Sequence, residues 1–359
     1  MPDLVGYTHY QLVSVTGNKP AAPQAWFPML VAFDADAGLN DHTQNVGLDV
    51  AFCLDGDDTP LPYEREEWTD LGAAVTARFW VRVPSVASVA DTDLRKHIGK
   101  AGGTAYATPS DTWNENGAGN FMFVHHMNDI TTSSVNDSTA NGNNGTKIGA
   151  NEPVETTGIV GKGQEFDGVQ DRISLGNDAS LNTTAAITME VWLDWDGVTD
   201  NAPRIFDKAT AAPTAYINQI NLKLGFYGKV GGVQRDFTLG LTAITAGWKH
   251  VALTYDDADD TFRAYLNGAA DGTNNTYAGA LTADANTLYI GDRDASDRSY
   301  DGGMDEARWS KIARPVAWLL FGVKNIADYA GTITHGAWTP SAVSSAYYYR
   351  ETVLNRRLR

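Results

Sequence analysis

The chain has 359 residues with 44 acidic and 27 basic side chains, which gives a formal net charge of −17. A protein this acidic repels phosphate backbones, so we expect no nucleic-acid partner. Its 35 glycines are typical of turn-rich all-β structure, and its length predicts two or three domains.

The sequence lacks the usual signals for export and for membrane insertion. Residues 1–10 contain neither the basic nor the apolar region of a signal peptide. The apolar run at residues 316–323 is shorter than the roughly 20 residues that a membrane span needs. Cys53 is the single cysteine, so no intrachain disulfide can form, and stability must come from cores, metal or assembly.

Residues 1–117 predict a β domain of their own. Four stretches read as strands: residues 11–15, 27–33, 48–54 and 75–83. In the last stretch, apolar residues alternate with Thr, Arg and Trp, which is the pattern of a strand with one face in a core. The segment 104–119 is rich in Gly, Pro, Ser and Asn and places the domain boundary near residues 116–119.

Residues 118–314 predict a second β domain. Its first expected strand is 121–127. In residues 187–195 every second side chain is apolar and faces a core, while Glu190, Trp192 and Asp194 lie on the opposite face. Further along, residues 249–255 and 261–266 predict a hairpin whose loop is the acidic DDADD segment.

Five motifs of this second domain occur in a characteristic order. They are FDGVQDRISLG (166–176), ITMEVWLDW (187–195), GWKHVALTYD (247–256), LNG (266–268) and GGMDEARWS (302–310). Together they resemble the laminin-G-like, concanavalin-type jelly roll, close to its pentraxin-like branch, over about residues 121–314. This fold hosts lectins, glucanases and plain adhesion modules, so the resemblance implies a fold more strongly than a function.

The first domain carries a resemblance of its own. The segments FPMLVAFD, DVAFCLDGDDTPLPYEREEW and ARFWVRVPSV are similar to an uncharacterised β-sandwich domain, often found just upstream of laminin-G-like modules in bacterial and viral surface proteins. Ile98 and Gly99 stand where that family usually has Tyr-Gly. The sequence therefore predicts an all-β chain of two β-sandwich domains, the second a laminin-G-like jelly roll.

The segment NDSTANGNNG (136–145) predicts either a plain surface loop or a Ca²⁺ site. Its Asn and Asp residues supply the oxygen ligands that Ca²⁺ prefers. In the laminin-G-like family a loop of this kind often lies near the aspartate of the last strand, here Asp305. The resemblance thus implies that Asp137, Asn143 and Asp305 are Ca²⁺ ligands.

A second polar loop, GDRDASDRSYDGG (291–303), precedes the last strand. Carboxylates and Arg can bind sugar hydroxyls, and Tyr can stack on a sugar ring. Arg293, Asp294 and Tyr300 are therefore the predicted glycan contacts. The alternative is a surface loop whose opposite charges neutralise one another.

The segment from Glu190 to Asp194 is the main argument for an enzyme. It is similar to the E-x-D-x-E strand of concanavalin-type glucanases, in which two carboxylates act as nucleophile and acid. Here Trp192 replaces the middle carboxylate, and the last position is the shorter Asp. We therefore predict no catalytic residues and a non-enzymatic chain.

Residues 315–359 differ from the rest of the chain. Pro315 can open a helix, and segment 316–329 is apolar around most of its circumference, so it must pack on something. The arm that follows holds Trp338 and Tyr347–Tyr349, and from residue 314 onward six basic and two acidic residues give +4. We predict that this helix and arm attach the protein to other virion proteins or to a second copy.

These features together predict a virion-associated structural or adhesion protein, such as a phage tail fibre, spike or capsid decoration, that binds cell-surface glycans. A surface-type domain without an export signal can leave the cell inside a virus particle, and the cell surface is the alternative location. A glucanase-like hydrolase and a purely structural module without a ligand are the alternative functions.

Overall fold

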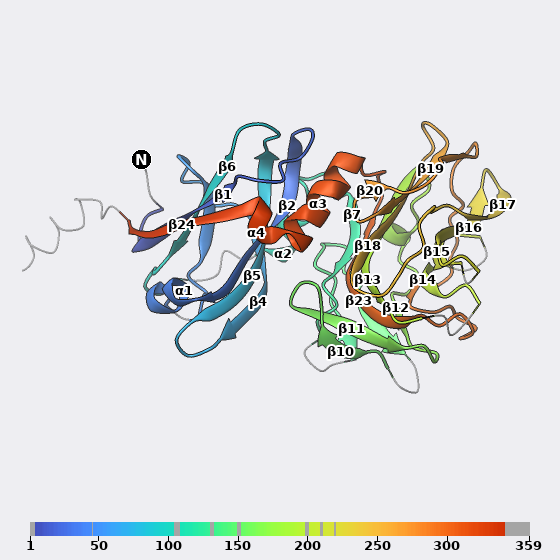
Figure 1. Cartoon of the computed structure of the whole chain (residues 1–359), viewed down its shortest axis with the longest axis horizontal. Helices are drawn as coiled ribbons and strands as arrows, with labels where there is room; N and C mark the ends of the chain where they lie inside the picture. The colour runs from blue at the N-terminus through green and yellow to red at the C-terminus, as the bar shows by residue number, and fades with distance from the viewer. Residues whose placement is uncertain are drawn as a thin grey trace, which may run out of the picture. The chain divides into compact units, whose positions relative to one another are not determined.

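Both halves of the chain are built from antiparallel β-sheets, so the all-β prediction is confirmed. The computed structural model describes residues 4–44, 46–103, 108–129, 133–148, 152–197, 201–208, 211–218 and 220–341. The chain divides into unit 1, Met1–Thr112 with Asp328–Arg359, and unit 2, Trp113–Ala327 (Figure 1). Among the described residues, no helix has the length and hydropathy that a membrane crossing requires.

The described residues of unit 1 form two antiparallel sheets with the strand orders β24-β1-β6-β3 and β2-β5-β4. Its elements are β1 (His9–Val15), β2 (Gln24–Asp36), α1 (Ala37–His42), β3 (Ala51–Leu54), β4 (Tyr63–Asp70), β5 (Val75–Val86), β6 (Thr92–Ile98), α2 (Pro109–Thr112), α4 (Tyr329–Thr332) and β24 (Ile333–Pro340). An aromatic core joins the sheets, because the Phe52 ring of β3 lies 5.4 Å from Phe79 of β5. Every second residue of β5 from Val75 to Val83 is buried, as the alternation predicts.

Strand β24 completes unit 1 although it follows unit 2 in the sequence. It pairs antiparallel with β1, from His9 opposite Pro340 to Val15 opposite Ile333. Its Trp338 ring centroid lies 4.2 Å from the buried Lys96 amine, and the Phe33 ring lies 3.3 Å from the same amine. Burial lowers the pKa of Lys96 well below its ordinary value, and the two rings replace part of the lost hydration.

Unit 2 consists of a nine-stranded and an eight-stranded sheet within the described residues. The first contains β7 (Phe121–His125), β10 (Val154–Thr157), β11 (Lys162–Asp167), β13 (Ala186–Trp195), β18 (Lys249–Asp256), β19 (Thr261–Leu266), β20 (Ala269–Ala270), β21 (Asn275–Thr276) and β23 (Asp301–Ser310). The second contains β8 (Ser134–Val135), β9 (Gly145–Ile148), β12 (Arg172–Ser174), β14 (Arg204–Asp207), β15 (Thr214–Ile217), β16 (Leu224–Val230), β17 (Val233–Thr238) and β22 (Tyr289–Ile290). The predicted hairpin is confirmed as β18 and β19.

The two sheets of unit 2 enclose its hydrophobic core. Met189, Val191 and Leu193 of β13 all belong to that core, as their spacing predicts. Trp309 of β23 contacts Phe206 of β14 at a ring distance of 6.0 Å, which joins the two sheets. The opposite face of β13 carries Glu190 and Trp192.

The helix α3 (Val316–Ala327) covers that opposite face. Its Trp318, Leu319 and Val323 close over the outer side chains of β13, β18 and β23, leaving a cavity of about 10 Å³. The apolar circumference of the helix explains why it docks here, since these three side chains are buried. Helix α3 therefore belongs to unit 2.

The observed division differs from the predicted domains 1–117, 118–314 and 315–359. Unit 2 begins at Trp113, because Glu115 forms a buried ion pair with Arg314 and thus joins both ends of this unit. The expected third segment is shared between the units, with α3 in unit 2 and β24 in unit 1. Trp338 consequently packs within unit 1, while Tyr347–Tyr349 lie outside the described residues.

Candidate functional site

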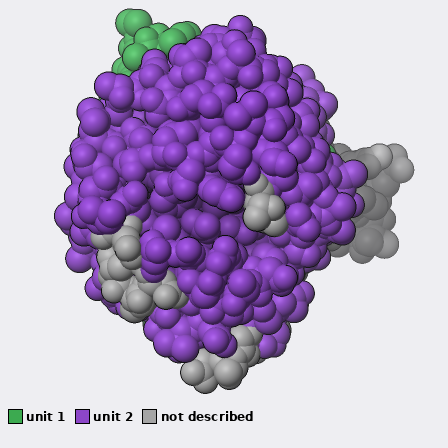
Figure 2. All heavy atoms as spheres, turned by 90° about the vertical axis from the view of Figure 1, so that its right-hand side faces the viewer, with its two compact units in different colours: residues 1–112, 328–359 green, residues 113–327 purple. Residues whose placement is uncertain are grey.

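A pocket of about 730 Å³ opens on the eight-stranded sheet of unit 2. Its lining mixes aromatic, basic and acidic side chains: Asn201, Ala202, Arg204, Asp207, Tyr216, Asn218, Tyr227, Asp236, Phe237, Thr238, Arg293, Asp294, Ala295 and Arg298. Figure 2 views unit 2 from the side on which Figure 1 labels β15, β16 and β17. The volume lies in the range of small-molecule sites, and we refer to this cavity as the sheet-face pocket.

The floor of the sheet-face pocket is a cross-strand row of four strands. Arg204 of β14 pairs with Tyr216 of β15, which pairs with Gly225 of β16, which in turn pairs with Thr238 of β17. Neighbours along each strand face the other way, so Ala215 enters the core. Period-two geometry therefore places Arg204, Tyr216 and Thr238 on one face.

Arg204 is the buried cation of this floor. Its guanidinium lies 5.3 Å from the Tyr216 ring centroid and 5.9 Å from that of Tyr227. Its Nε lies 2.9 Å from a carboxylate oxygen of Asp207. Burial lowers the pKa of Arg204, and Asp207 opposes that change. The guanidinium thus holds two tyrosine rings in place.

Strand β17 forms one wall of the sheet-face pocket. The Tyr216 hydroxyl donates a 2.7 Å hydrogen bond to Asp236. Burial, and next this hydrogen bond, raise the pKa of Tyr216, so the phenol stays protonated and keeps donating. Asn218 donates to the Thr238 hydroxyl over 3.2 Å, which fixes another polar pair at the rim.

The remaining wall is the loop before β23. Arg293 donates two hydrogen bonds to Asp297, of 2.5 and 2.7 Å, and this contact raises the pKa of Arg293. Arg298 donates to the backbone carbonyl of Asn201. Asp294 accepts a 2.9 Å hydrogen bond from the Tyr289 hydroxyl. The loop is therefore held by its own charged side chains while it lines the pocket.

Comparison with known families assigns the domain that carries this pocket. Residues 167–319 match the model of the concanavalin A-like lectin/glucanases superfamily. Unit 2 contains a concanavalin A-like domain. The match covers every strand that contributes to the sheet-face pocket, and it ends within α3. The laminin-G-like resemblance of the sequence is thereby confirmed.

Solved structures resemble this concanavalin A-like domain only distantly. The binding domain of Paraclostridial mosquitocidal protein 1 is 12% identical with a TM-score of 0.46, and the match covers 57% of this chain and 52% of that one, about half its length. Domain 4 of AbnA, a GH43 extracellular arabinanase from Geobacillus stearothermophilus in complex with arabinotriose, is 19% identical with a TM-score of 0.45, covering 56% and 97%. The binding domain of botulinum neurotoxin serotype G is 9% identical, with a TM-score of 0.43 and coverage of 56% and 50%. No curated protein matches the sequence.

The predicted glycan contacts separate in the concanavalin A-like domain. Arg293 and Asp294 both line the sheet-face pocket. Tyr300 is fully buried in the core, where its hydroxyl donates to the carbonyls of Asp194 and Gly303. A ring without an exposed face cannot stack on a sugar, so the predicted role of Tyr300 does not agree with its position.

The predicted Ca²⁺ ligands are engaged in hydrogen bonds of the domain itself. Both carboxylate oxygens of Asp137 accept from its own loop and from β7, through the amides of Val124, Thr139 and Asn143 and the hydroxyl of Thr139. Asp305 is buried and accepts from the amides of Val160 and Glu306. Calcium binding stays a prediction of the sequence.

The glucanase-like carboxylates of the concanavalin A-like domain lie under α3 or in loop contacts. Glu190 is 3% exposed and lies 3.1 Å from the His250 ring nitrogen. Asp194 accepts a 2.8 Å hydrogen bond from the Gly247 amide. In the part of the chain that the structure describes, α3 leaves only about 10 Å³ above Glu190, which is too little for a polysaccharide. This packing argues against the glucanase alternative.

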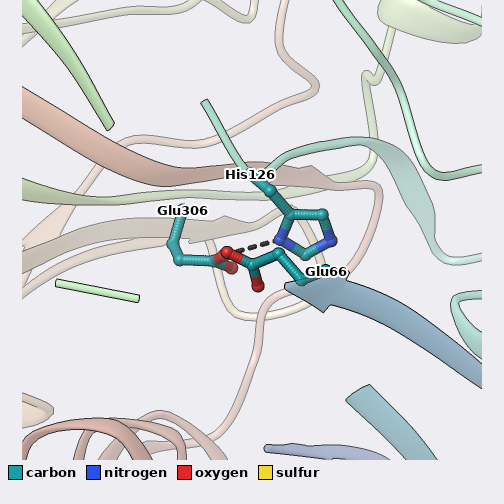
Figure 3. A group of neighbouring side chains, drawn as sticks. All are labelled: Glu66, His126 and Glu306. Atoms are coloured by element: carbon teal, nitrogen blue, oxygen red, sulfur yellow. Dashed lines mark hydrogen bonds and ion pairs between the residues drawn. The ribbon is translucent and has the colours of Figure 1, made fainter. Parts of the chain in front are cut away.

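A buried ionic cluster lies beside Glu190 in the same layer. His126 lies 2.6 Å from the Glu306 carboxylate, and Figure 3 shows the imidazole pointing to it. Arg308 contacts the other oxygen of Glu306 at 2.5 Å. Burial alone would raise the pKa of Glu306, but the neighbouring His126 and Arg308 outweigh that effect and lower it. His125 is also buried, but its Nε2 donates a separate 2.8 Å hydrogen bond to the Asn143 carbonyl. The adjacent histidines thus face different surroundings, because neighbouring residues of a strand point to opposite faces.

The sequence motifs do not predict most of the pocket floor. Arg204, Tyr216, Tyr227 and Asp236 lie on four strands that carry none of the five family motifs. The alternation of TAYI and LGFY was the available signal, because it sets each tyrosine opposite a core residue. That these faces meet at one pocket depends on the pairing of β14 to β17.

Proposed function

We propose that unit 2 is a non-enzymatic carbohydrate-binding module whose ligand site is the sheet-face pocket. The observation that carries the proposal is the combination of Tyr216 and Tyr227 with arginines and aspartates in one cavity of about 730 Å³. Aromatic faces bind the apolar faces of sugar rings, and charged groups bind their hydroxyls strongly. The lectin-like superfamily of the domain is consistent with this chemistry.

Glycan-array screening followed by calorimetry tests this function. Tyr227→Ala should weaken a bound glycan by about 1 kcal/mol or more, because a partly exposed ring of the pocket is lost. Tyr10→Ala, at a partly exposed tyrosine of β1 in unit 1, is the matched control and should leave binding unchanged. A glycan that binds both variants equally well would rule out the pocket as its site.

The hydrolase alternative needs a separate measurement. We expect no release of reducing ends when the protein is incubated with the polysaccharides that it binds. Release that disappears in Glu190→Gln would contradict the non-enzymatic proposal and would require α3 to move.

We further propose that the module serves attachment of a virus particle to a cell surface. The resemblance of the first domain to modules of bacterial and viral surface proteins supports this setting. Mass spectrometry of purified particles should detect the chain, together with its structural partners. Detection only on cells or in the medium would favour the alternative location.

A further inference from the structure

We propose that the sheet-face pocket selects neutral saccharides over acidic sugars and amino sugars, an inference that rests on the proposed glycan-binding function. The argument begins with the charges of the lining. Three arginines, Arg204, Arg293 and Arg298, face three aspartates, Asp207, Asp236 and Asp294. The described lining therefore carries no net charge.

Two of the arginines are compensated by aspartates. Arg204 lies 2.9 Å from Asp207, and Arg293 donates twice to Asp297, which lies next to the lining. Arg298 donates to a backbone carbonyl, and its own amide donates to Asp292. When Asp292 and Asp297 are counted with the lining, carboxylates outnumber guanidiniums. An anionic ligand that enters the pocket therefore meets net repulsion.

Donors and acceptors nevertheless both remain for a ligand. Asp236 and Asp294 are exposed, and each is seen to accept one tyrosine hydroxyl, although a carboxylate can accept several hydrogen bonds. Arg298 is partly exposed, and a guanidinium has more N–H groups than its bond to Asn201 uses. The β17 wall of the pocket thus presents acceptors, and the loop before β23 presents both donors and acceptors.

A sugar hydroxyl matches this arrangement because it donates and accepts at once. The carboxylate of a uronic acid only accepts, so it can pair with the Arg298 guanidinium but cannot donate to Asp236 or Asp294. An ammonium only donates, so the amino group of an amino sugar can pair with the aspartates but offers no acceptor to the Arg298 guanidinium. Desolvating a polar group without a partner costs about 1–3 kcal/mol, which is enough to select among sugars. The overall charge of −17 adds long-range repulsion of acidic glycans.

Calorimetry with three sets of oligosaccharides of equal length tests the inference: neutral, uronic-acid and amino-sugar chains. We expect binding in the neutral set alone. Asp236→Asn and Asp294→Asn should each weaken the neutral ligand about tenfold, because a neutral amide accepts less strongly than a carboxylate. Asparagine still accepts from the tyrosine hydroxyls, so both variants should fold.

A charge-matched control separates the pocket from the overall field. Asp58→Asn removes one negative charge from an exposed position of unit 1 and should leave every affinity unchanged. Uronic-acid or amino-sugar chains that bind better than neutral ones would overturn the selectivity while glycan binding itself stands. Neutral binding that neither pocket variant changes would also overturn it. Absence of binding in all three sets would mean that the proposed function has failed.

Discussion

The Tyr216 hydroxyl crosses a neighbouring strand to donate a 2.7 Å hydrogen bond to Asp236. The two residues lie on β15 and β17, which β16 separates in the sheet. Gly225 of β16 provides the space, because a Cβ at this position would lie 2.4 Å from Cζ of Tyr216. The geometry of the pocket floor thus depends on a residue without a side chain.

Replacing this glycine should disturb the pocket. Gly225→Ala should destabilise unit 2 by about 1–3 kcal/mol through overpacking against the tyrosine ring, and it should weaken glycan binding. In a Tyr216→Ala background the same substitution should cost clearly less, because the ring that it strikes is gone. Denaturant unfolding of the unsubstituted chain, the two single variants and the double variant measures this coupling. Additive effects would mean that ring and glycine do not interact.

Arg293 offers a test with a closely matched control. Arg293 and Arg263 each pair with an aspartate four positions away, at 2.5 Å in both cases, and their exposures are similar at 32% and 29%. Only Arg293 lines the pocket. Arg293→Ala should weaken glycan binding about tenfold, whereas Arg263→Ala should not. Both should change stability by less than about 1 kcal/mol. Equal affinities of the two variants would exclude Arg293 from the site.

The C-terminal strand should be essential to unit 1. A chain ending at Ala330 loses β24, which exposes the edge of β1 and removes the Trp338 ring from Lys96. A chain ending at Ser341 keeps both and serves as the control. We expect the shorter chain to lose or markedly lower the unfolding transition of unit 1 in calorimetry. Identical unfolding transitions of the two chains would show that unit 1 does not need β24.

Stability should depend on pH through Glu165. Burial, followed by the charges of Asp196, Asp194 and Asp301, raises its pKa from 4.5 to about 7. The folded state then binds more protons than the unfolded state between these values, so this carboxyl lowers stability as the pH rises from 4.5 to about 7. Glu165→Gln should stabilise the protein by about 1 kcal/mol at pH 8, discounted for partial exposure, and by little at pH 4. Urea unfolding at both values checks the sign, and an equal gain at each would contradict it.

Calcium provides a direct test of the loop at residues 136–145. Because the carboxylate of Asp137 already accepts from its own loop, we expect equal melting temperatures with saturating Ca²⁺ and with chelator. Asp137→Asn should still destabilise the loop, because an amide accepts less strongly than a carboxylate. If Ca²⁺ at a hundred times its Kd stabilises the protein by about 2.7 kcal/mol, the Ca²⁺ prediction is correct and the loop rearranges.

Local patterns in the sequence were sufficient for much of the fold. Period-two alternation identified β5 and β13 together with the faces that they bury, because each strand repeats its environment every second residue. Ordered motifs identified the concanavalin A-like domain. Polar composition identified the loop that brings Arg293 and Asp294 to the pocket. These features depend on neighbouring residues, so they can be predicted without knowing which strands pair.

Tertiary structure decided the rest. Tyr300 lies only seven residues after Arg293, yet Arg293 lines the pocket and Tyr300 is buried in the core. The composition of the loop does not reveal where the chain passes from the surface to the core. The pocket floor needs Arg204, Tyr216 and Asp236 from strands whose register is set by pairing over long sequence separations. Helix α3 and strand β24 are separated only by the short helix α4 but belong to different units. The apolar helix packs on an uncovered sheet face, and the strand pairs with an unpaired sheet edge, and neither partner can be identified from neighbouring residues.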